Sequence, residues 1–408
     1  MNPDAVPINS YILKVASRCN LNCSYCYMYN KGDDSYTGQP PVMSRETIRH
    51  LLAKVRTHCI EQAVGEVTFS FHGGEPLLAG PEFFRHFVAD AASILGESVT
   101  VTYLLETNGT LLTTQWLDLF CELGIGFGIS LDGPPAIHDR SRVNHAGLGS
   151  YREVRRAIDL VVANPRYQAV FGGVLSVVDL SSDPLEVYDH LRQIGIAQCD
   201  FLLPDGTWNH PPKGVELEAT STPYADWLIS IFDPWFDSQD TSFSIRLFDS
   251  IIRLLFDTHA GNDSLGGGQN GLLVIETDGE IEPVDVLKIC GPSFTKTGLN
   301  VADDQISDAY AVDLVQLYVQ GSAAACRTCR NCPVFSVCGA GYLPHRYSPL
   351  NGFDNPSVYC RDLMKLITHV RDRVLTAMPA TTRRKLGLEP LGYEQALAIL
   401  GAHTASTA

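Results

Sequence analysis

Residues 19–26 read Cys-Asn-Leu-Asn-Cys-Ser-Tyr-Cys, so that three cysteines stand at a C-x3-C-x2-C spacing. Three thiolates on one short loop can hold three irons of a cubane [4Fe–4S] cluster, and the fourth iron is then open to a substrate or cofactor. Zinc would need a fourth ligand and is usually held by C-x2-C pairs. We therefore predict that Cys19, Cys23 and Cys26 ligate an iron–sulfur cluster.

The chain around this loop alternates apolar strands with amphipathic helices as far as residue 204. The pattern predicts strands at 9–16, 66–72, 99–106, 125–131, 169–178 and 200–203, and helices at 44–64, 81–95, 113–123, 151–163 and 184–194. Such βα units build a parallel sheet, here a full or partial barrel. Each polar signature comes directly after a strand, at the face where such barrels carry their chemistry.

The regular alternation ends after Pro204, and the second half reads differently. We expect a loop at 205–218, two helices within 222–258, a Gly-rich linker at 262–271, a hairpin turn at 277–279 and a helix at 363–378. The predicted segments are a barrel over 1–220, a helical bridge over 221–265, a cysteine-rich α+β domain over 266–378 and a weakly patterned tail over 379–408.

Composition limits the class of protein. The chain has 408 residues, 45% of them hydrophobic, which is ample for a core, and its formal charge of −16 argues against nucleic-acid binding. It has no apolar run of the length that crosses a membrane, and Met1–Asn9 lacks the features of a secretory signal, so a cytoplasmic location is expected. In a reducing compartment, grouped cysteines indicate metal ligands rather than disulfides.

A second group of cysteines lies near the C-terminus: Cys326, Cys329, Cys332, Cys338 and Cys360. An iron–sulfur cluster and a four-cysteine zinc site are both compatible with this group. The scattered Cys59, Cys121 and Cys199 are expected to be buried as small apolar residues. The histidines show no spacing typical of metal ligands.

The cysteine loop, together with His72-Gly73-Gly74-Glu75-Pro76 at the end of the second strand, resembles the radical S-adenosylmethionine (SAM) superfamily. The resemblance covers about residues 9–200 and implies a partial (β/α)6 barrel of the TIM type. In that family the glycine motif contacts the methionine amino group of SAM: bare glycines admit the ligand, and Glu75 offers an anionic acceptor.

The same resemblance implies further SAM contacts at later strand ends and beside the cysteines: Tyr25, Asn108, Ser130, Asp132 and Arg142. Simple turn formation is the alternative for Asn108 and Asp132, and a surface position is the alternative for Arg142. In the family, the reduced cluster passes one electron to SAM, and the resulting 5′-deoxyadenosyl radical removes a hydrogen atom from the substrate.

The second cysteine group resembles the SPASM extension of peptide-modifying radical SAM enzymes. Cys329, Cys332, Cys338 and Cys360 match the four ligands of the outer auxiliary [4Fe–4S] cluster of that family. At two positions where the family has cysteines that ligate the inner cluster, this chain has Val284 and Tyr342. The remaining Cys290 and Cys326 are candidates for a rearranged inner cluster. The resemblance thus implies at least one auxiliary cluster.

In three features the chain resembles maturases that cross-link ribosomal peptides into cyclophanes. These features are the missing inner-cluster cysteines and the segments 201–207 and 351–360. This implies a precursor peptide as substrate and a flavodoxin- or ferredoxin-type electron donor. Because a fused leader-binding domain does not fit before residue 9, leader recognition is expected from the barrel mouth, the SPASM region or a separate leader-binding protein. The alternatives are a sulfatase-type formylglycine-forming maturase and a non-catalytic zinc or iron–sulfur scaffold, which has no need of a SAM motif.

Asp285 is the predicted catalytic base. In related maturases an Asp follows the inner-cluster cysteine directly, and Asp285 follows Val284, which stands in that cysteine's place. A carboxylate in a dry cavity is expected to have a raised pKa and so to be a better base near neutral pH. The alternative is that Asp285 fixes the turn after the hairpin by accepting backbone N–H bonds.

Overall fold

A computed structural model describes residues 6–217, 219–256, 258 and 262–405. By contacts the chain divides into two compact units: the barrel unit, with Met1–Ser176, His190–Gln198 and Asn270–Val319, and the helical unit, with Val177–Asp189, Cys199–Gln269 and Gln320–Ala408. Residues 270–319, expected mostly within a cysteine-rich domain, therefore cluster with the barrel. The sequence-based domain boundaries stay predictions, and the first five and last three residues of the outermost segments lie outside the described residues.

The barrel unit is built on a sheet with the strand order β10-β9-β8-β1-β2-β3-β4-β5. Its parallel strands are β1 (Ser10–Ala16), β2 (Glu66–Gly73), β3 (Thr100–Thr107), β4 (Ile125–Ser130), β5 (Phe171–Val177) and β8 (Leu272–Ile275). An antiparallel extension follows, with β9 (Glu280–Glu282) and β10 (Leu299–Asn300). The expected alternation of strands and helices is confirmed.

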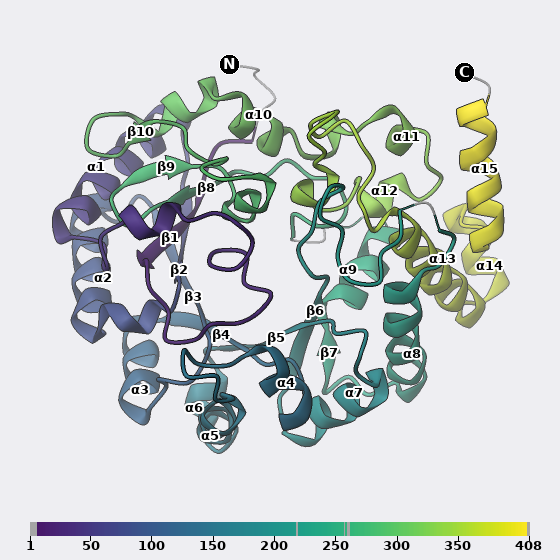
Figure 1. Cartoon of the computed structure of the whole chain (residues 1–408), viewed down its shortest axis with the longest axis horizontal. Coiled ribbons are helices and arrows are strands. Elements are labelled where there is room, and N and C mark those ends of the chain that lie inside the picture. Colours follow the sequence, from purple (N-terminus) through teal and green to yellow (C-terminus); the bar gives the residue numbers. More distant parts are fainter. Residues whose placement is uncertain (1–5, 218, 257, 259–261, 406–408) are drawn as a thin grey trace. The chain divides into compact units, whose positions relative to one another are not determined.

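Helices cover the outer side of these strands (Figure 1). They are α1 (Arg45–Gln62), α2 (Pro81–Leu95), α3 (Thr114–Leu123), α4 (Pro135–Ser141), α5 (Tyr151–Val162), α6 (Pro165–Gln168) and α10 (Asp313–Gln320). Short 3-10 turns complete the unit: η1 (Ser35–Gly38), η2 (Pro76–Ala79), η3 (Asp285–Cys290) and η4 (Ile306–Ala311). Neither α4 nor α10 was expected, because both are short and lack a long apolar stripe.

Local chemistry explains why these helices begin and pack where they do. The Ser44 hydroxyl accepts a hydrogen bond from the Thr47 backbone N–H at 3.0 Å, which caps α1 as the sequence predicts. In the next layer, the ring of Phe87 on α2 lies 5.1 Å from that of Phe69 and 5.0 Å from that of Phe71, both on β2, in edge-to-face geometry. The core therefore holds β2 and its motif in place.

The helical unit contains α8 (Pro223–Ser238), β7 (Ser244–Ile245), α9 (Arg246–Leu255), η5 (Gly321–Ala324), α11 (Arg327–Arg330), α12 (Phe335–Cys338), η6 (Leu343–Arg346), α13 (Cys360–Ala377), α14 (Ala380–Leu386) and α15 (Tyr393–Ala405). The remaining α7 (Pro184–Gln193) and β6 (Gln198–Leu202) belong partly to each unit. Helix α13 packs against α8, α9 and α15. The helices α14 and α15 lie in the segment expected to be a weakly patterned tail. None of the described helices is long and apolar enough to cross a membrane.

Candidate active site

The first three cysteines lie on the loop that follows β1. Cys19, Cys23 and Cys26 carry free thiols and are half-buried. The loop is fastened to the segment after α4, since the backbone N–H of Asn22 donates to the carbonyl oxygen of Val143 at 2.7 Å. The structure thus brings the three predicted ligands together on one fixed loop at the carboxyl end of the sheet.

The surroundings of these sulfur atoms suit thiolate ligands. The Sγ atom of Cys19 accepts hydrogen bonds from the Leu21 backbone N–H at 3.4 Å and the Asn108 amide at 3.8 Å. Burial raises the pKa of Cys19 to about 12 and that of Cys23 to about 11, although the Arg142 charge lowers the latter. A thiolate in such a place needs a bound cation, and the residues present fit a cluster that supplies iron.

The glycines of the second strand permit a close approach of two segments of the chain. Gly73 has a φ of +131°, and a Cβ there would lie 2.2 Å from the Ala16 carbonyl oxygen. A Cβ on Gly74 would lie 2.1 Å from the Tyr29 hydroxyl and 2.3 Å from the Arg18 carbonyl oxygen. These glycines let the cysteine loop approach the end of β2, and their expected contact with SAM stays a prediction.

Glu75 is fully buried, and its carboxylate is bound by the chain itself. One oxygen accepts hydrogen bonds from the Thr107 hydroxyl at 2.7 Å and the Leu77 backbone N–H at 3.1 Å, and the other accepts from the Asn108 N–H at 2.8 Å. Burial raises the pKa of Glu75 to about 7. The carboxylate therefore fixes the end of β3, and its expected contact with SAM stays a prediction.

Three other predicted SAM contacts form one network. The Tyr25 hydroxyl donates to Asp132 Oδ2 at 2.6 Å, and Arg142 Nε donates to the same oxygen at 3.0 Å. The guanidinium also lies 5.4 Å from the centre of the Tyr25 ring. Asp132 and Arg142 are buried, so Arg142 is not the surface arginine of the alternative, and Asp132 does more than form a turn.

The other two predicted contacts lie at the ends of β3 and β4. The Asn108 amide donates to Asn20 Oδ1 at 2.8 Å, which ties it to the cysteine loop, and the Ser130 hydroxyl donates to Glu106 Oε1 at 3.1 Å. On β5, the buried Ser176 hydroxyl has no partner among the described atoms, as expected of a group that meets a polar ligand. The residues present therefore fit SAM. Sequence reasoning missed Glu106 and Ser176, since neither lies in a recognisable motif.

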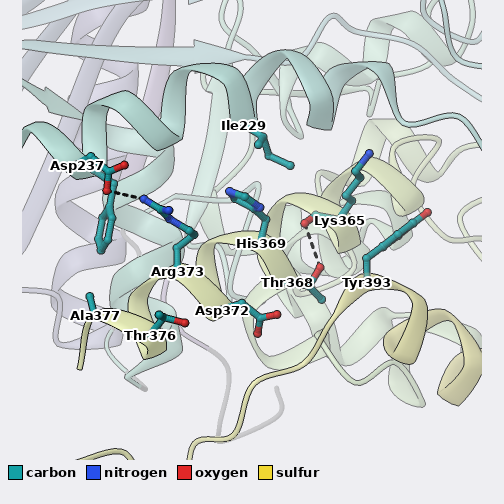
Figure 2. A pocket seen from close by; sticks show the side chains of 11 residues that line it. Ile229, Asp237, Lys365, Thr368, His369, Asp372, Arg373, Thr376, Ala377 and Tyr393 are labelled. Carbon is teal, nitrogen blue, oxygen red and sulfur yellow. Dashed lines mark hydrogen bonds and ion pairs between the residues drawn. The ribbon is translucent and has the colours of Figure 1, made fainter. Parts of the chain in front are cut away.

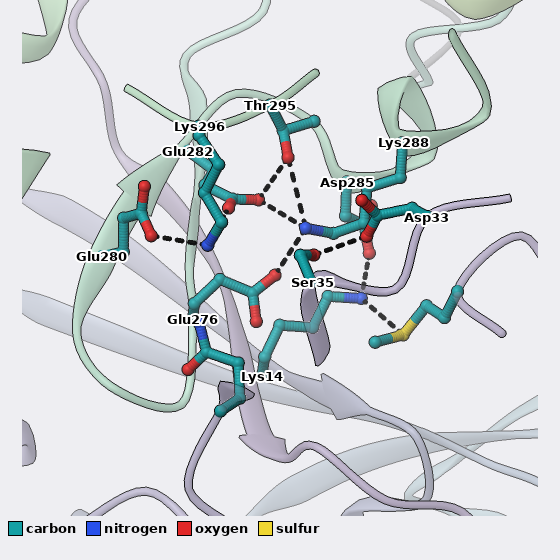
Figure 3. A network of polar contacts seen from close by, with 12 residues as sticks. Lys14, Asp33, Ser35, Glu276, Glu280, Glu282, Asp285, Lys288, Thr295 and Lys296 are labelled. Atoms are coloured by element: carbon teal, nitrogen blue, oxygen red, sulfur yellow. Dashed lines mark hydrogen bonds and ion pairs between the residues drawn. The ribbon is translucent and has the colours of Figure 1, made fainter. Parts of the chain in front are cut away.

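Asp285 lies at the start of η3 in a buried polar network (Figure 3). Its Oδ2 atom accepts hydrogen bonds from the Lys14 ammonium, with which it forms an ion pair, and from the Tyr27 hydroxyl. The same ammonium lies 3.0 Å from the Tyr27 hydroxyl and 3.4 Å from His72 Nδ1. Side chains thus hold Asp285, and nothing in the sequence pattern had singled out Lys14 or Tyr27.

The expected raised pKa of Asp285 is wrong. Burial alone would raise it, but the Lys14 ammonium, His72 and the hydrogen bonds from Lys14 and Tyr27 outweigh burial and hold the pKa of Asp285 well below its ordinary value. Burial, helped by the Lys14 charge, lowers the pKa of His72 to about 4, so His72 is neutral near neutral pH. Asp285 is therefore an ionised carboxylate with one cationic partner.

A second buried lysine holds the hairpin beside Asp285. The Lys288 ammonium lies 2.7 Å from Glu282 Oε2 and 3.0 Å from Glu276 Oε1, which are carboxylates of β9 and the end of β8 (Figure 3). Val284, in the place of an inner-cluster cysteine, is 2% exposed and belongs to the apolar core. Ion pairs and apolar packing thus hold this segment, and Val284 offers no metal ligand.

In the helical unit, the four outer cysteines line one cavity. They come from three helices and one loop: Cys329 (α11), Cys332 (after α11), Cys338 (α12) and Cys360 (first residue of α13). Burial raises the pKa of Cys338 and that of Cys360, the latter to about 12. The positive charge of the buried Arg346 faces this group. The arrangement fits a cluster that completes the four thiolates.

The two leftover cysteines are placed differently. Cys326 packs with Ala325, Cys329 and Ala340 in an apolar cluster, and a hydrogen bond from the Cys329 thiol lowers its pKa. Cys290 ends η3 in the barrel unit. Neither lies among the residues that line the cysteine cavity of the helical unit. Their assignment to a rearranged inner cluster stays a prediction.

Zinc and a cubane cluster differ in how closely they gather their ligands. Within the described ranges, no three His, Cys, Asp or Glu side chains are gathered as a single metal ion requires. A zinc ion holds four ligands at about 2.0–2.3 Å, whereas a cubane spreads its thiolates over four separate irons. Of the scattered cysteines, Cys59 and Cys199 are buried, and Cys121 donates to the Arg166 carbonyl oxygen at 3.3 Å.

A second cavity of the helical unit lies beside α8 and α13 (Figure 2). The basic side chains that line it lie against acids of α8: His369 lies 2.8 Å from Asp233, and Arg373 lies 2.5 Å from Asp237. Lys365 pairs in the same way with Asp226. These contacts stabilise the packing of α13 on α8, and each of the three basic side chains has an acidic partner.

Comparison with known proteins agrees with the geometry of the barrel unit. Residues 13–170 match the Radical SAM superfamily. Among similar proteins, a cysteine-type anaerobic sulfatase-maturating enzyme of Clostridium novyi is 25% identical over 86% of this chain and 92% of its own length. A serine-type enzyme of Klebsiella aerogenes is 28% identical over 83% of this chain and 80% of its own length.

A solved structure extends the likeness to the whole fold. Native anSMEcpe with bound AdoMet aligns with a TM-score of 0.76 at 23% identity, over 91% of this chain and 98% of the other. The same protein has also been solved with AdoMet and a peptide named Kp18Cys. The predicted partial barrel is thus confirmed, and the superfamily resemblance expected from the cysteine loop agrees with the match over residues 13–170.

Proposed function

We propose that this chain, a radical SAM enzyme that uses SAM and a [4Fe–4S] cluster, is a maturase that oxidises a side chain at Cβ within a peptide or protein substrate. The first candidate product is formylglycine, made from a Cys or Ser residue. The similarity to sulfatase-maturating enzymes of both the cysteine and the serine type, over more than four fifths of the chain, supports this candidate over the cyclophane reaction expected first.

The observation that carries the proposal is the buried Asp285 carboxylate, which forms an ion pair with Lys14 of β1. When bound, the cluster and SAM supply a 5′-deoxyadenosyl radical, which removes one hydrogen atom from the substrate. To become an aldehyde (from Ser) or a thioaldehyde (from Cys), the substrate must then lose one proton and one electron, and water converts the thioaldehyde to the aldehyde with release of hydrogen sulfide. Asp285 Oδ2 accepts this proton in our proposal, and an iron–sulfur or flavodoxin-type acceptor takes the electron.

In this proposal the chain's other residues bind and orient SAM and keep water from the base. The Tyr25–Asp132–Arg142 network and Asn108 fix the cysteine loop against β3 and β4, so that SAM is held in one orientation. Lys14 is buried and His72 is half-buried, and in our proposal both keep bulk water away from Asp285. Each of these roles is assigned to residues that the structure places around the loop.

The outer cysteines are proposed to hold one auxiliary [4Fe–4S] cluster. Four thiols around one cavity, with Arg346 nearby to offset their negative charge, support this assignment. A cluster with four thiolate ligands has no open iron, so its roles are electron transfer and support of the fold. A flavodoxin- or ferredoxin-type protein remains the proposed electron donor.

Cross-linking of a ribosomal peptide into a cyclophane is the second candidate. The specific observation in its favour is the loss of inner-cluster ligands, since Val284 and Tyr342 stand in the places of two cysteines. In this reaction too, a Cβ radical forms, and the ring that it attacks later loses one proton and one electron. Recognition of a leader by the chain itself or by a separate protein is part of this second proposal only.

The test is a direct assay of products. Reconstituted enzyme, SAM and a reductant are mixed anaerobically with peptides that contain a Cys or Ser in a sulfatase-type context, or an aromatic residue near an aliphatic one. We expect 5′-deoxyadenosine and an aldehyde that reacts with a hydrazide. Loss of two hydrogens without an aldehyde would favour the cross-link, and 5′-deoxyadenosine with every peptide unchanged would contradict both candidates.

A further inference from the structure

Lys14 is a charged residue in an unusual place. It lies on β1 in register with His72 of β2, and it is 0% exposed. Its ammonium contacts Asp285, the Tyr27 hydroxyl at 3.0 Å, Met28 Sδ at 3.3 Å and His72 Nδ1 at 3.4 Å. A buried ammonium is costly unless it is paired, and Asp285 is the one anion in direct contact with it among the described residues.

The charges around this pair come from every element that packs against it. Lys14 belongs to β1, His72 to β2, Tyr27 to the cysteine loop and Asp285 to η3. The Lys14 charge also acts to lower the pKa of Glu276, at the end of β8, but the ion-pair partner of Glu276 is Lys288. The same charge acts to lower the pKa of Cys26 on the cysteine loop. His72 is neutral, so its Nδ1 accepts from the ammonium.

We propose that Lys14 is a positioning residue for proton removal. Its ammonium keeps the Asp285 carboxylate ionised and fixes the orientation of Oδ2, so that Asp285 can accept a proton over the whole working pH range. This inference rests on the proposed role of Asp285. Lys14 itself touches neither substrate nor SAM in this account. It acts through Asp285, in concert with the Tyr27 hydroxyl that donates to the same oxygen.

The proton balance is consistent with a weak base. After the hydrogen atom is removed, the substrate radical that gives up an electron becomes a cationic group, and the proton on that group is strongly acidic. A carboxylate of low proton affinity suffices to take such a proton, provided that it is always ionised. Asp285 then becomes a neutral carboxylic acid, still hydrogen-bonded to the Lys14 ammonium, and returns the proton to solvent when product leaves.

A purely structural ion pair would behave differently. If Lys14 only joined β1 to η3, its loss would lower stability and activity by a similar factor at every pH. If it keeps Asp285 ionised, its loss leaves a buried carboxylate with no cation, and burial then raises the proton affinity of Asp285. Product formation would then fail on the acid side alone.

The experiment compares reconstituted enzymes with Lys14→Met, Lys14→Gln, Lys14→Arg and Asp285→Asn, across acid to mildly alkaline pH. The measured quantity is the ratio of modified peptide to 5′-deoxyadenosine, so that SAM cleavage and substrate oxidation are separated. Lys296→Met is the matched control, because Lys296 pairs with Glu280 and Glu282 rather than with Asp285.

We expect a ratio that does not change with pH in the wild type, in Lys14→Arg and in the Lys296→Met control. In Lys14→Met and Lys14→Gln the ratio should fall at least about tenfold on the acid side and recover at alkaline pH. Infrared difference spectra provide a readout that needs no turnover. A carboxylic-acid band that Asp285→Asn abolishes should appear at acid pH in Lys14→Met.

Each outcome decides between the two ideas. A flat ratio in folded Lys14→Met or Lys14→Gln, with no carboxylic-acid band, overturns the positioning role of Lys14 while Asp285 can still be the base. An unchanged ratio in Asp285→Asn overturns the proposed base itself. If Lys14→Met fails to fold, Lys14→Gln keeps a polar side chain and the same ratio can be measured in that variant. The wild-type ratio expected in Lys14→Arg tests whether the positive charge of residue 14 is what Asp285 requires.

Discussion

The two groups of cysteines differ in how the fold assembles them. The first offers three thiols within eight consecutive residues, on a loop at the carboxyl end of a parallel sheet. The second collects four thiols from α11, the turn after it, α12 and the start of α13, around one cavity. Three ligands leave an iron open and four complete it, so the first group suits reaction with a bound molecule and the second suits storage or transfer of electrons.

Their surroundings differ in the same sense. Around the first group lie donors and charges such as Asn108, Asp132 and Arg142. The cavity of the second is lined by apolar groups such as Val334, Phe335 and Leu400 as well as its cysteines. Polar groups orient a ligand, whereas an apolar shell excludes solvent and tunes a cluster's potential. The comparison teaches that ligand count and surroundings point to the same division of roles.

The strongest test removes the first group. The triple substitution of Cys19, Cys23 and Cys26 by Ala should abolish 5′-deoxyadenosine formation and leave a folded protein, because the open iron is lost while the core is untouched. Product is measured by chromatography, and folding by circular dichroism. Cys121→Ala is the control, since its half-buried thiol donates to the Arg166 carbonyl oxygen and belongs to neither group of cysteines. Undiminished SAM cleavage in the triple variant would refute the division of roles.

The second test asks whether proton removal belongs to the first region. Asp285→Asn keeps the shape of the side chain but removes its basicity, so modified peptide should fall by roughly 10²–10⁴-fold while SAM is still cleaved. Asp278→Asn, at the exposed turn of the hairpin, is the control and should leave both activities unchanged. Product formation at the wild-type rate would make Asp285 a structural residue.

The third test separates the two groups by their metal. In the triple Cys→Ala background, about 4 irons should remain if the outer cysteines hold one cubane. A further Cys332→Ala, at the cavity, should remove them, whereas Cys326→Ala, outside the cavity lining, should retain them. Iron and zinc are counted by mass spectrometry of the metals. Stoichiometric zinc in anaerobically purified protein would contradict the auxiliary cluster.

The smallest effect concerns stability beside the first group. Burial raises the pKa of Glu75 from 4.5 to about 7, so between these pH values the folded chain keeps a proton that the unfolded chain has lost. The free energy of unfolding should therefore fall as pH rises through this window, by about 3 kcal/mol in all. Glu75→Gln should remove that slope in urea unfolding, and Glu82→Gln, on the exposed side of α2, should keep it. Equal slopes in all three proteins would contradict the buried carboxyl.

Most of the barrel could be predicted from the sequence. The strands and helices from residue 9 to 202 lie within about two residues of their expected bounds, because apolar periodicity and turn residues act locally. The short α4 and the helices α14 and α15 were not predicted, since their apolar stripes are short or weak. The cysteine loop and the motif after β2 could be recognised for the same local reason. The three cysteines lie within eight residues of one another, and the two glycines of the motif are adjacent.

Non-local contacts were the ones that sequence reasoning could not supply. Lys14, His72 and Asp285 are spread over more than 270 positions, yet one ammonium touches both of the others. Nothing in the residues around Asp285 could therefore show that its pKa is lowered rather than raised. In the same way, nothing near Glu75 in the chain could show that its carboxylate accepts a hydrogen bond from the backbone N–H of Asn108.

The sequence by itself determined the chemistry that is available: an iron–sulfur loop after the first strand, a partial barrel around it and four further cysteines in series. Only the tertiary structure decided how each charge is used, since it alone placed Lys14 against Asp285, Arg142 against Asp132 and Val284 in the apolar core. The physical reason is range. Helix, strand and loop ligands follow from neighbours in the chain, whereas burial and Coulomb interactions follow from neighbours in space.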